Sequence, residues 1–493
     1  MNITRFLHHV RAGRLAAFAA ASCACAAASD WPRFHGVNGS GISADQQPLP
    51  TKWSDSENLK WKVALPGPGS SSPIVVGQRV YVTCWSGYGA DPKDAGDEKD
   101  LRRHLVCLDR ESGKVIWDTP VDPVLPEDDY SGNFTQHGYA SQTPVSDGER
   151  IYVFFGKTGA LAFDMDGHKL WQTSVGTGSG AHGWGTASSP ILYKDILIVP
   201  ATAESGSLVG LNKETGAKVW TFSDRSLTST WGTPVLADCG AGRTDLVFAV
   251  PYKVWGLDPK TGKERWHCEG LNSDSICSSA FVNDGIVYVF ETGPRGGGTM
   301  AIKAGGEGDV TKTAILWRGN TRSRIETPVI DGNRIYWAGN KLADCVDAAT
   351  GKPIYHKSIS GGAAPANQGG GRPGGPGGFG GPRPGGFGGP GPGGPGGGQR
   401  QGGGRGGRGG GMGGRGGMGG QDYSSPVLAD GKIYYVSRSG TAYVYGVGPD
   451  YKFLAQNRFT GGGDFSATPA VSDGQIFIRS SKYLYCVAQA DGK

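Results

Sequence analysis

The chain has 493 residues, of which 19% are charged and 10% aromatic, and its formal net charge is +5. The positive charge is local, because six arginines lie within residues 361–421 and three within residues 1–29, and neither segment holds Lys, Asp or Glu. The rest of the chain is net acidic, which excludes a basic body that binds nucleic acid.

Residues 1–29 have the pattern of a secretory signal peptide. Three arginines precede an apolar, alanine-rich run, Leu15–Ala28, which ends in small residues suited to cleavage. We therefore expect an exported protein of the periplasm or cell envelope. A lipid anchor at Cys23, which follows a run of small residues, is an alternative. The apolar run is short for a membrane span, and no other segment is apolar and long enough to cross a membrane.

Residues 30–57 are punctuated by Gly and Pro and contain three large aromatic residues, Trp31, Phe34 and Trp53. This composition predicts an extended strap that packs on the following domain. We expect its aromatic side chains to anchor it there.

Residues 58–487 repeat one unit eight times. In the copy at 141–171, short apolar segments are separated by Gly and Asp turns, as in an antiparallel meander. Copies begin like SSSPIVVGQRVYV (70–82) and end like LNKETGAKVW (211–220), and most lie about 45 residues apart. Four strands per unit at this period predict an all-β, eight-bladed β-propeller.

The ends of the repeat region indicate how the ring closes. The eighth unit stops near residue 487, after its third strand, whereas residues 58–63 form an extra strand before the first unit. We expect this N-terminal strand to complete blade eight and remove an open edge. One aromatic residue per fourth strand is then expected, at Trp61, Trp117, Trp171, Trp220, Trp266, Trp317, Tyr355 and Phe453.

Units of this form resemble the pyrroloquinoline-quinone (PQQ)-like β-propeller repeat family over roughly residues 58–487. That family includes quinoprotein alcohol dehydrogenases and the propeller lipoprotein of the outer-membrane β-barrel assembly machinery. The resemblance implies the fold, but it leaves both an enzyme and a scaffold open, because one fold hosts many functions.

Three insertions are expected to leave the propeller on one face. They are Ser86–Arg103 within blade one, Asp118–Ala140 between blades one and two, and 361–421 between blades six and seven. The third is mostly Gly and Pro with scattered Arg, so it is expected to be disordered and to serve as a spacer or tether. Loops gathered on one face of a rigid scaffold are a common location of function.

The residues just before each first strand are expected to converge on the loop-rich mouth of the central channel. The ligand-binding candidates there are His137, Tyr139, His182, Trp184, Trp231, Arg324, Glu326, Asp422 and Asp464, with Thr230, Tyr423 and Phe465 beside them. Imidazole, carboxylate and indole groups suit a metal or a small polar ligand. The alternatives are structural: the tryptophans plug the channel, and the histidines bond to loop carbonyls.

For an enzyme, the resemblance implies PQQ stacked on Trp184 or Trp231, with Ca²⁺ and a catalytic carboxylate such as Glu326 or Asp464. The chain lacks the adjacent cysteine pair typical of quinoprotein alcohol dehydrogenases, and it has no haem-attachment CxxCH motif. No calcium ligand set and no catalytic residue can be assigned. The glycine-rich run 176–180 precedes no helical pattern, which excludes a nucleotide-binding loop.

Seven cysteines remain after the expected cleavage, and export permits disulfides. Cys84 with Cys107, and Cys268 with Cys277, are two candidate pairs. We expect the other three to be buried thiols. These are Cys239, Cys345 and Cys486.

The sequence favours an exported propeller that acts as a non-catalytic binding or assembly scaffold, with protein partners in the cell envelope. The alternative is a PQQ- or metal-dependent oxidoreductase, of the alcohol or sugar dehydrogenase type, with its site at the channel mouth. Carbohydrate binding through Trp184, Trp231 and Tyr139 is a third possibility.

Overall fold

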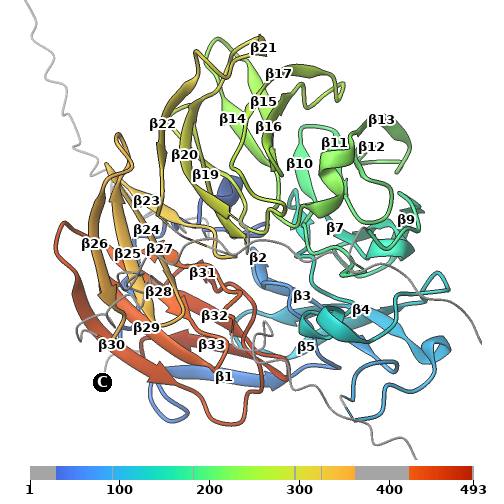
Figure 1. The fold of residues 1–493 in the computed structure, drawn as a ribbon. Coiled ribbons are helices and arrows are strands. Elements are labelled where there is room, and N and C mark those ends of the chain that lie inside the picture. The colour runs from blue at the N-terminus through green and yellow to red at the C-terminus, as the bar shows by residue number, and fades with distance from the viewer. Residues whose placement is uncertain are drawn as a thin grey trace, which may run out of the picture.

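The structure is a computed structural model that describes residues 29–91, 93–180, 183–293, 296–321, 323, 325–360 and 421–490. Its strands form eight antiparallel blades arranged in a ring (Figure 1). The described residues contain short 3-10 turns but no α-helix. The predicted all-β, eight-bladed propeller is therefore confirmed. The expected signal peptide apart from Ser29, and the glycine-rich insertion apart from Gln421, lie outside the described residues.

Each blade consists of four strands, which follow one another from the channel outward. Blade 1 consists of β2 (Ile74–Val76), β3 (Arg79–Ser86), β4 (Arg102–Asp109) and β5 (Val115–Val121). Blade 2 consists of β6 (Val145–Ser146), β7 (Arg150–Phe154), β8 (Ala160–Asp164) and β9 (Lys169–Thr173). Blade 3 consists of β10 (Ile191–Tyr193), β11 (Ile196–Ala201), β12 (Ser207–Asn212) and β13 (Lys218–Ser223). Blade 4 consists of β14 (Val235–Asp238), β15 (Thr244–Val250), β16 (Lys253–Leu257) and β17 (Glu264–Glu269).

The second half of the ring follows the same plan. Blade 5 consists of β18 (Phe281–Asn283), β19 (Ile286–Gly293), β20 (Gly296–Lys303) and β22 (Ile315–Gly319). Blade 6 consists of β23 (Val329–Asp331), β24 (Arg334–Gly339), β25 (Leu342–Asp347) and β26 (Pro353–Ser358). Blade 7 consists of β27 (Val427–Ala429), β28 (Lys432–Val436), β29 (Thr441–Gly446) and β30 (Lys452–Arg458). Blade 8 consists of β31 (Ala470–Ser472), β32 (Gln475–Arg479), β33 (Tyr483–Ala488) and β1 (Leu59–Ala64). A short extra strand, β21 (Gly308–Asp309), pairs in parallel with the outer strand of blade 4.

The N-terminal strand closes the ring. β1 pairs antiparallel with β33, with Trp61 opposite Cys486. The first and last parts of the propeller, blue and red in Figure 1, therefore lie side by side in one blade. This pairing confirms the predicted closure and removes the edge that the last blade would otherwise expose.

The inner strands are apolar because neighbouring blades cover both of their faces. β3 is buried over six consecutive residues, whereas the outer strand β5 alternates between exposed and half-buried positions. Runs of β-branched and aromatic residues suit this environment. Each gap between two blades holds a layer of apolar side chains, such as the layer of Val153, Phe155 and Leu161 with Ile74 and Leu105 between blades 1 and 2.

The outer-strand tryptophans join consecutive blades. Trp117 packs on Gly167 of blade 2, and its Nε1 donates to the carbonyl of Met165 at 3.1 Å. Gly167 has a φ of +86°, and a Cβ there would lie 2.7 Å from the indole ring, so glycine is required. Trp171 contacts the equivalent turn of blade 3 in the same way, at Gly216. The turn glycine of one blade thus contacts the outer-strand tryptophan of the preceding blade, which explains why both residues recur in the repeat.

The predicted aromatic of blade 7 is wrong. In blade 6 the strand register pairs Tyr355 with Cys345, and in blade 7 it pairs Ala455 with Val444, so Ala455 occupies the aromatic position. Phe453 lies two residues earlier and is 38% exposed. The turn of blade 7, residues 446–451, lacks the D-x-x-T-G pattern found in blades 4 and 6 and its close variants in blades 1 and 3, so the sequence alone misplaced the aromatic position by two residues.

The N-terminal strap crosses the end of the ring opposite the mouth. Between residues 31 and 38 it hydrogen-bonds to blades on different sides of the ring, namely 1, 2, 4 and 7. The partners are Val75, Ser146, Pro234, Leu236 and Pro426. Trp31 and Trp53 are buried as anchors, as expected. A segment that touches all of these blades spans the channel axis, so it closes this end of the channel.

Neither candidate disulfide forms. Cys84 and Cys107 are both on blade 1 but belong to different apolar layers, one facing blade 8 and the other facing blade 2. Cys268 is buried between blades 4 and 5, whereas Cys277 lines the central cavity. All seven described cysteines are free thiols. Cys345 and Cys486 are buried, as expected, and Cys239 is partly buried.

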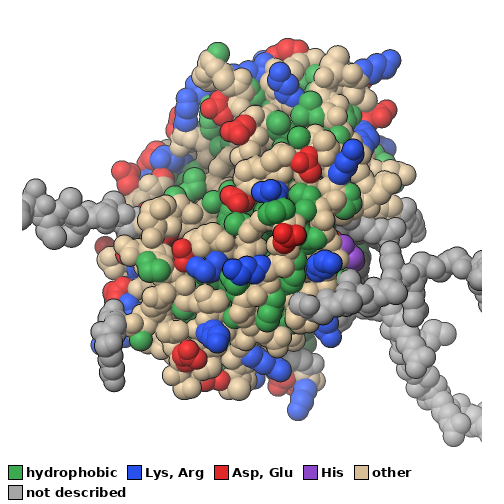
Figure 2. All heavy atoms as spheres, turned by 90° about the vertical axis from the view of Figure 1, so that its left-hand side faces the viewer, with side chains coloured by type: hydrophobic (Ala, Val, Ile, Leu, Met, Phe, Trp, Pro, Cys, Tyr) green, Lys and Arg blue, Asp and Glu red, His purple; other side chains and the backbone are tan. Residues whose placement is uncertain are grey.

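The outer wall of the ring carries charges of both signs among apolar side chains. Figure 2 shows one side of this wall, with Lys, Arg, Asp and Glu interspersed with hydrophobic groups. The apolar groups include outer-strand residues such as Leu170, Val219 and Leu316, each between 45% and 51% exposed. Separately, the residues that the structure describes include no helix long and apolar enough to cross a membrane.

Candidate functional site

A cavity of about 350 Å³ occupies the central channel. Its floor includes Phe34 from the strap, and its opposite end lies among the loops that carry Asn133, Gln136 and Trp184. Because the strap closes the far end, the channel is a blind cavity rather than a passage. A blind cavity can hold a ligand but cannot conduct one through the ring.

Three of the nine predicted site residues line this cavity: His137, Trp184 and Trp231. His137 Nε2 lies 2.7 Å from the carbonyl oxygen of Trp184, and Nδ1 lies 2.8 Å from Ser141 Oγ. Burial lowers the pKa of His137, and the bonded carbonyl opposes this effect only in part. A neutral imidazole that donates from Nε2 to a carbonyl matches the structural alternative for this residue.

The two tryptophans form one aromatic wall. The ring centroids of Trp184 and Trp231 lie 5.1 Å apart with an interplanar angle of 33°. Trp231 Nε1 donates to the carbonyl of Gly185 at 2.9 Å, which joins the first-strand approaches of blades 3 and 4. Tyr423 also lines the cavity, and the guanidinium of Arg438 lies 5.3 Å from its ring centroid.

Four other predicted residues lie away from the cavity. Tyr139 is 3% exposed and packs among aromatic side chains between the first two insertions, with its hydroxyl donating to the carbonyl of Asp128. Glu326 is buried against Gly339 of β24. Asp422 accepts backbone N–H groups of two loops, and Asp464 pairs with a guanidinium at the rim. The repeat alignment located their backbones, but it could not give the directions of their side chains.

The remaining two candidates, His182 and Arg324, lie outside the described residues. Of the neighbouring residues in the alignment, Thr230 and Phe465 are buried and do not line the cavity, whereas Tyr423 does.

A groove of about 770 Å³ adjoins the cavity on the mouth face and shares Ser70, Gln136, His137 and Ser466 with it. The groove runs over blades 8 and 1 and is lined by both early insertions, as shown by Ala90, Ala95, Tyr130 and Thr135. The expectation that these insertions share one face is therefore met.

Arg438 organises the rim of this groove, although the sequence did not single it out. Its Nη2 lies 2.9 Å from Asp464 Oδ2, and its Nη1 donates to Gln136 Oε1 at 2.7 Å. One side chain from blade 7 thus joins blade 8, Tyr423 and the insertion between blades 1 and 2. A tight β28–β29 turn holds it there, and only the repeat position marked that turn.

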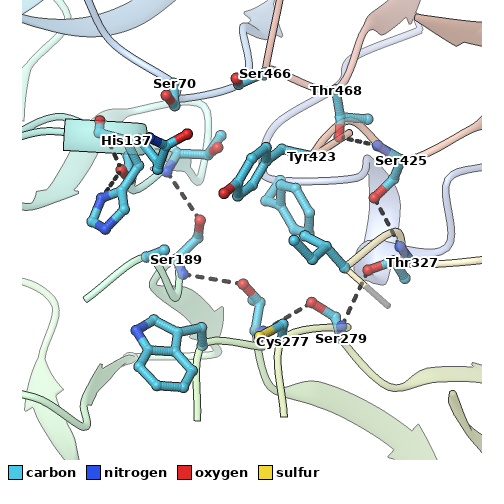
Figure 3. A pocket seen from close by; sticks show the side chains of 18 of the residues that line it. Ser70, His137, Ser189, Cys277, Ser279, Thr327, Tyr423, Ser425, Ser466 and Thr468 are labelled. Carbon is cyan, nitrogen blue, oxygen red and sulfur yellow. Dashed lines mark hydrogen bonds between the residues drawn. The ribbon is translucent and has the colours of Figure 1, made fainter. Parts of the chain in front are cut away.

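A ring of hydroxyl groups around the cavity was also not anticipated from the sequence. The residue before each repeat proline, or before Ala280 in blade 5, is Ser or Thr in every blade. These residues are Ser72, Thr143, Ser189, Thr233, Ser279, Thr327, Ser425 and Thr468. Figure 3 shows several of them around the cavity with the hydrogen bonds that join them. Asp274, Cys277 and Glu291 of blade 5 also line the cavity, and Glu291 Oε2 accepts the backbone N–H of Cys277 at 2.6 Å.

Behind the mouth lies a second set of charged groups. Arg103 on β4 pairs with Glu127 at 2.6 Å, and Lys157 pairs with Asp128 at 2.8 Å, so these pairs fix the second insertion to blades 1 and 2. Beside them Glu204 is only 6% exposed, and burial raises its pKa to about 8.

The described His, Cys, Asp and Glu side chains form no group of three or more that could hold a metal ion. Within those residues, the cavity and the mouth offer aromatic faces, hydroxyls and carboxylates. This arrangement suits non-covalent binding.

Comparisons with known proteins agree with the fold. The family model described as outer membrane protein assembly factor BamB matches residues 99–253 and 201–304. No curated protein matches the sequence.

Solved structures of low sequence identity share the architecture. BamB from Moraxella catarrhalis aligns with a TM-score of 0.53 at 10% identity, over 88% of this chain and 98% of that one. A europium-containing methanol dehydrogenase aligns with a TM-score of 0.55 at 11% identity, over 93% and 98%. The quinohemoprotein alcohol dehydrogenase ADHIIG from Pseudomonas putida HK5 aligns with a TM-score of 0.52 at 9% identity, over 94% of this chain and 81% of that one. The chain is thus an eight-bladed β-propeller, and the match over residues 99–304 supports a likeness of its repeat to the PQQ-like propellers.

Proposed function

We propose that this propeller is exported and acts as a non-catalytic scaffold that binds proteins of the cell envelope. The observation that carries the proposal is the groove of about 770 Å³ on the mouth face, which continues into the blind cavity. An open groove of this size suits an extended polypeptide segment better than a single small molecule.

The lining of the groove supports a polypeptide ligand. One wall is the irregular segment from Leu65 to Ser70, which is rich in glycine and proline and exposes little side chain to the groove. Tyr130 adds an aromatic surface, and Lys482 and Asp464 add charges of opposite sign. Mixed aromatic and charged contacts are typical of protein-binding surfaces. The family-model match to an outer membrane protein assembly factor supports partners in the envelope.

The test is site-specific cross-linking in cells of the protein's own host. A photo-reactive amino acid replaces Gln136, which lines both the groove and the cavity. The matched control carries it at Val37, which is 61% exposed on the strap. We expect envelope proteins, identified by mass spectrometry, to be captured from position 136 at least about tenfold more than from position 37.

A charge reversal, Arg438→Glu, should reduce that capture about tenfold, because it replaces the ion pair with Asp464 at the rim by two like charges. Equal capture from the two positions, or capture that Arg438→Glu leaves unchanged in a folded protein, would contradict the proposal.

A quinoprotein oxidoreductase is the second candidate, and the Trp184–Trp231 wall is the observation that favours it. A planar quinone stacks well on an indole. The metal part of such a site has less support, because the described acidic and sulfur ligands provide no group of three. We therefore assign no catalytic step to a quinone or a metal in this chain.

Reconstitution with PQQ and Ca²⁺ separates the two candidates. We expect no saturable quinone absorbance change at about 50 μM PQQ and no dye reduction with alcohols or aldoses. Saturable binding with turnover that Trp231→Ala abolishes and Tyr252→Ala retains would establish the enzyme. Tyr252 is 55% exposed in the turn between β15 and β16, is not part of the cavity lining, and serves as the matched control.

A further inference from the structure

The eight channel hydroxyls form a closed hydrogen-bonded ring. Each hydroxyl oxygen accepts the backbone N–H of the equivalent residue in the preceding blade, at distances from 2.9 to 3.2 Å. The last of these bonds, from Thr468 N to Ser72 Oγ, closes the ring. Serine and threonine alternate without exception from blade 1 to blade 8.

These hydroxyls have their protons available for a ligand. All eight side chains line the cavity and belong to residues only 1–7% exposed. Each oxygen is used as an acceptor, and none of the eight donates to another group in the described parts of the chain. A hydroxyl that accepts an N–H bond is polarised as a donor. Buried donors require a partner, and the described protein groups provide none, so water or a ligand inside the cavity can serve as that partner.

The rest of the lining supplies complementary groups. Trp184, Trp231 and Tyr423 provide ring surfaces, and Phe34 provides an apolar floor. Asp274 and Glu291 bring carboxylate oxygens, which accept hydrogen bonds. The lining thus combines neutral donors, strong acceptors and aromatic faces within one closed-ended space.

We propose that the blind channel binds a small neutral polyol of about the size of a monosaccharide. Polyol hydroxyls accept from the ring and donate to the carboxylates, and the C–H faces of a sugar ring pack on indoles. Eight inward donors disfavour a cation, and the hydroxyls and rings that make up most of the lining carry no formal charge to attract an anion. A cavity of about 350 Å³ lies at the small end of ligand pockets, which span roughly 300–1,000 Å³.

This inference goes beyond the proposed scaffold and does not depend on it. The polyol site is the channel interior, whereas the protein site is the groove on the mouth face. The polyol test uses Trp231 and Thr233, which line the cavity and not the groove, so the failure of one proposal is distinguishable from the failure of the other.

The test is calorimetry and tryptophan fluorescence on the full chain, with glucose, N-acetylglucosamine and myo-inositol as probes and inorganic phosphate as the anionic comparison. We expect saturable binding of at least one polyol with a Kd of about 0.1–10 mM. Trp231→Ala should weaken polyol binding at least about tenfold, because the stacking surface is lost. Thr233→Val should weaken polyol binding to a similar extent, because one hydrogen-bond donor is lost.

Two variants outside the cavity serve as controls, Tyr252→Ala for an aromatic and Thr228→Val for a hydroxyl, and both should bind as the parent does. Thr233→Val also removes the acceptor for Ser189 N, so circular dichroism must show that it is folded. If that variant does not fold, Trp231→Ala decides. Absence of saturation by every polyol up to about 100 mM, or tighter binding of phosphate, overturns the proposal.

Discussion

Replacing Arg103 by Met is expected to destabilise the propeller by about 3–5 kcal/mol, because the change leaves a buried carboxylate without its partner. The side chains of Arg103 and Glu127 are 3% and 2% exposed and their charged atoms lie 2.6 Å apart. Arg103 also donates to the carbonyl of Tyr139 and to Thr158 Oγ1. One guanidinium thus links blade 1, the second insertion and blade 2.

The adjacent residue provides a matched control. Arg102 pairs with Asp122, but these side chains are 43% and 85% exposed, so Arg102→Met should cost less than about 1 kcal/mol. The measurement is the urea midpoint followed by tryptophan fluorescence. Adding Glu127→Gln to Arg103→Met should recover part of the loss, because no uncompensated charge then remains. Equal midpoints for the two arginine variants would show that the buried pair contributes little.

The fold could be predicted from the sequence because the recurring residues of the repeat make recurring contacts. A Ser or Thr and a proline before the first strand, a turn glycine and an outer tryptophan recur in spacing, and each makes the same contact in successive blades, such as Trp117 on Gly167. Closure also followed, because a unit that stops at three strands needs a fourth from elsewhere. The exception was blade 7, where the turn pattern is absent and Phe453 was taken for the aromatic position that Ala455 occupies.

The candidate site was only partly predictable, because a repeat alignment locates Cα positions and not side-chain directions. Trp184 and Trp231 point into the cavity, whereas Glu326 turns into its own blade against Gly339. Arg438 was missed because it reaches the mouth from a turn between strands rather than from a first-strand approach. No local pattern distinguishes that arginine from other exposed turn residues.

The hydroxyl ring was visible in the sequence and was overlooked. Serine or threonine precedes the repeat proline in seven blades, and in blade 5 Ser279 precedes Ala280. In the sequence these residues resemble ordinary strand-approach polar residues, since Ser and Thr commonly bond to nearby backbone. Only ring closure brings them together, because each bond joins residues more than forty positions apart, or almost four hundred at the closing step.

The surroundings of Glu204, behind the mouth, disfavour a charge on its carboxyl. Burial raises its pKa to about 8, the carboxylates of Asp128 and Glu127 add to the shift, and Arg103 opposes it. Lys157 also faces this space, although it pairs with Asp128. A void of about 20 Å³ adjoins the carboxyl, and Glu204 Oε2 has no hydrogen-bond partner among the described groups.

Replacing Glu204 by Gln is therefore expected to stabilise the protein at alkaline pH and to flatten its pH dependence. In the unfolded chain the carboxyl has a pKa near 4.5, and in the folded protein near 8. Between these values the folded state holds a proton that the unfolded state has lost, so the free energy of unfolding decreases as pH rises. The total decrease is about 3–5 kcal/mol and is complete above about pH 8.

Urea midpoints at about pH 5 and about pH 8 test this linkage. The parent should lose more stability than Glu204→Gln across that range, and the two should be closest at the acidic end. Glu149→Gln, an exposed substitution in the turn between β6 and β7, should follow the parent at both values. If Glu204→Gln loses as much stability as the parent between the two pH values, the buried carboxyl is ionised in the folded protein. The mouth would then hold an additional negative charge beside Glu127 and Asp128, which favours a cationic ligand over a neutral one at that position.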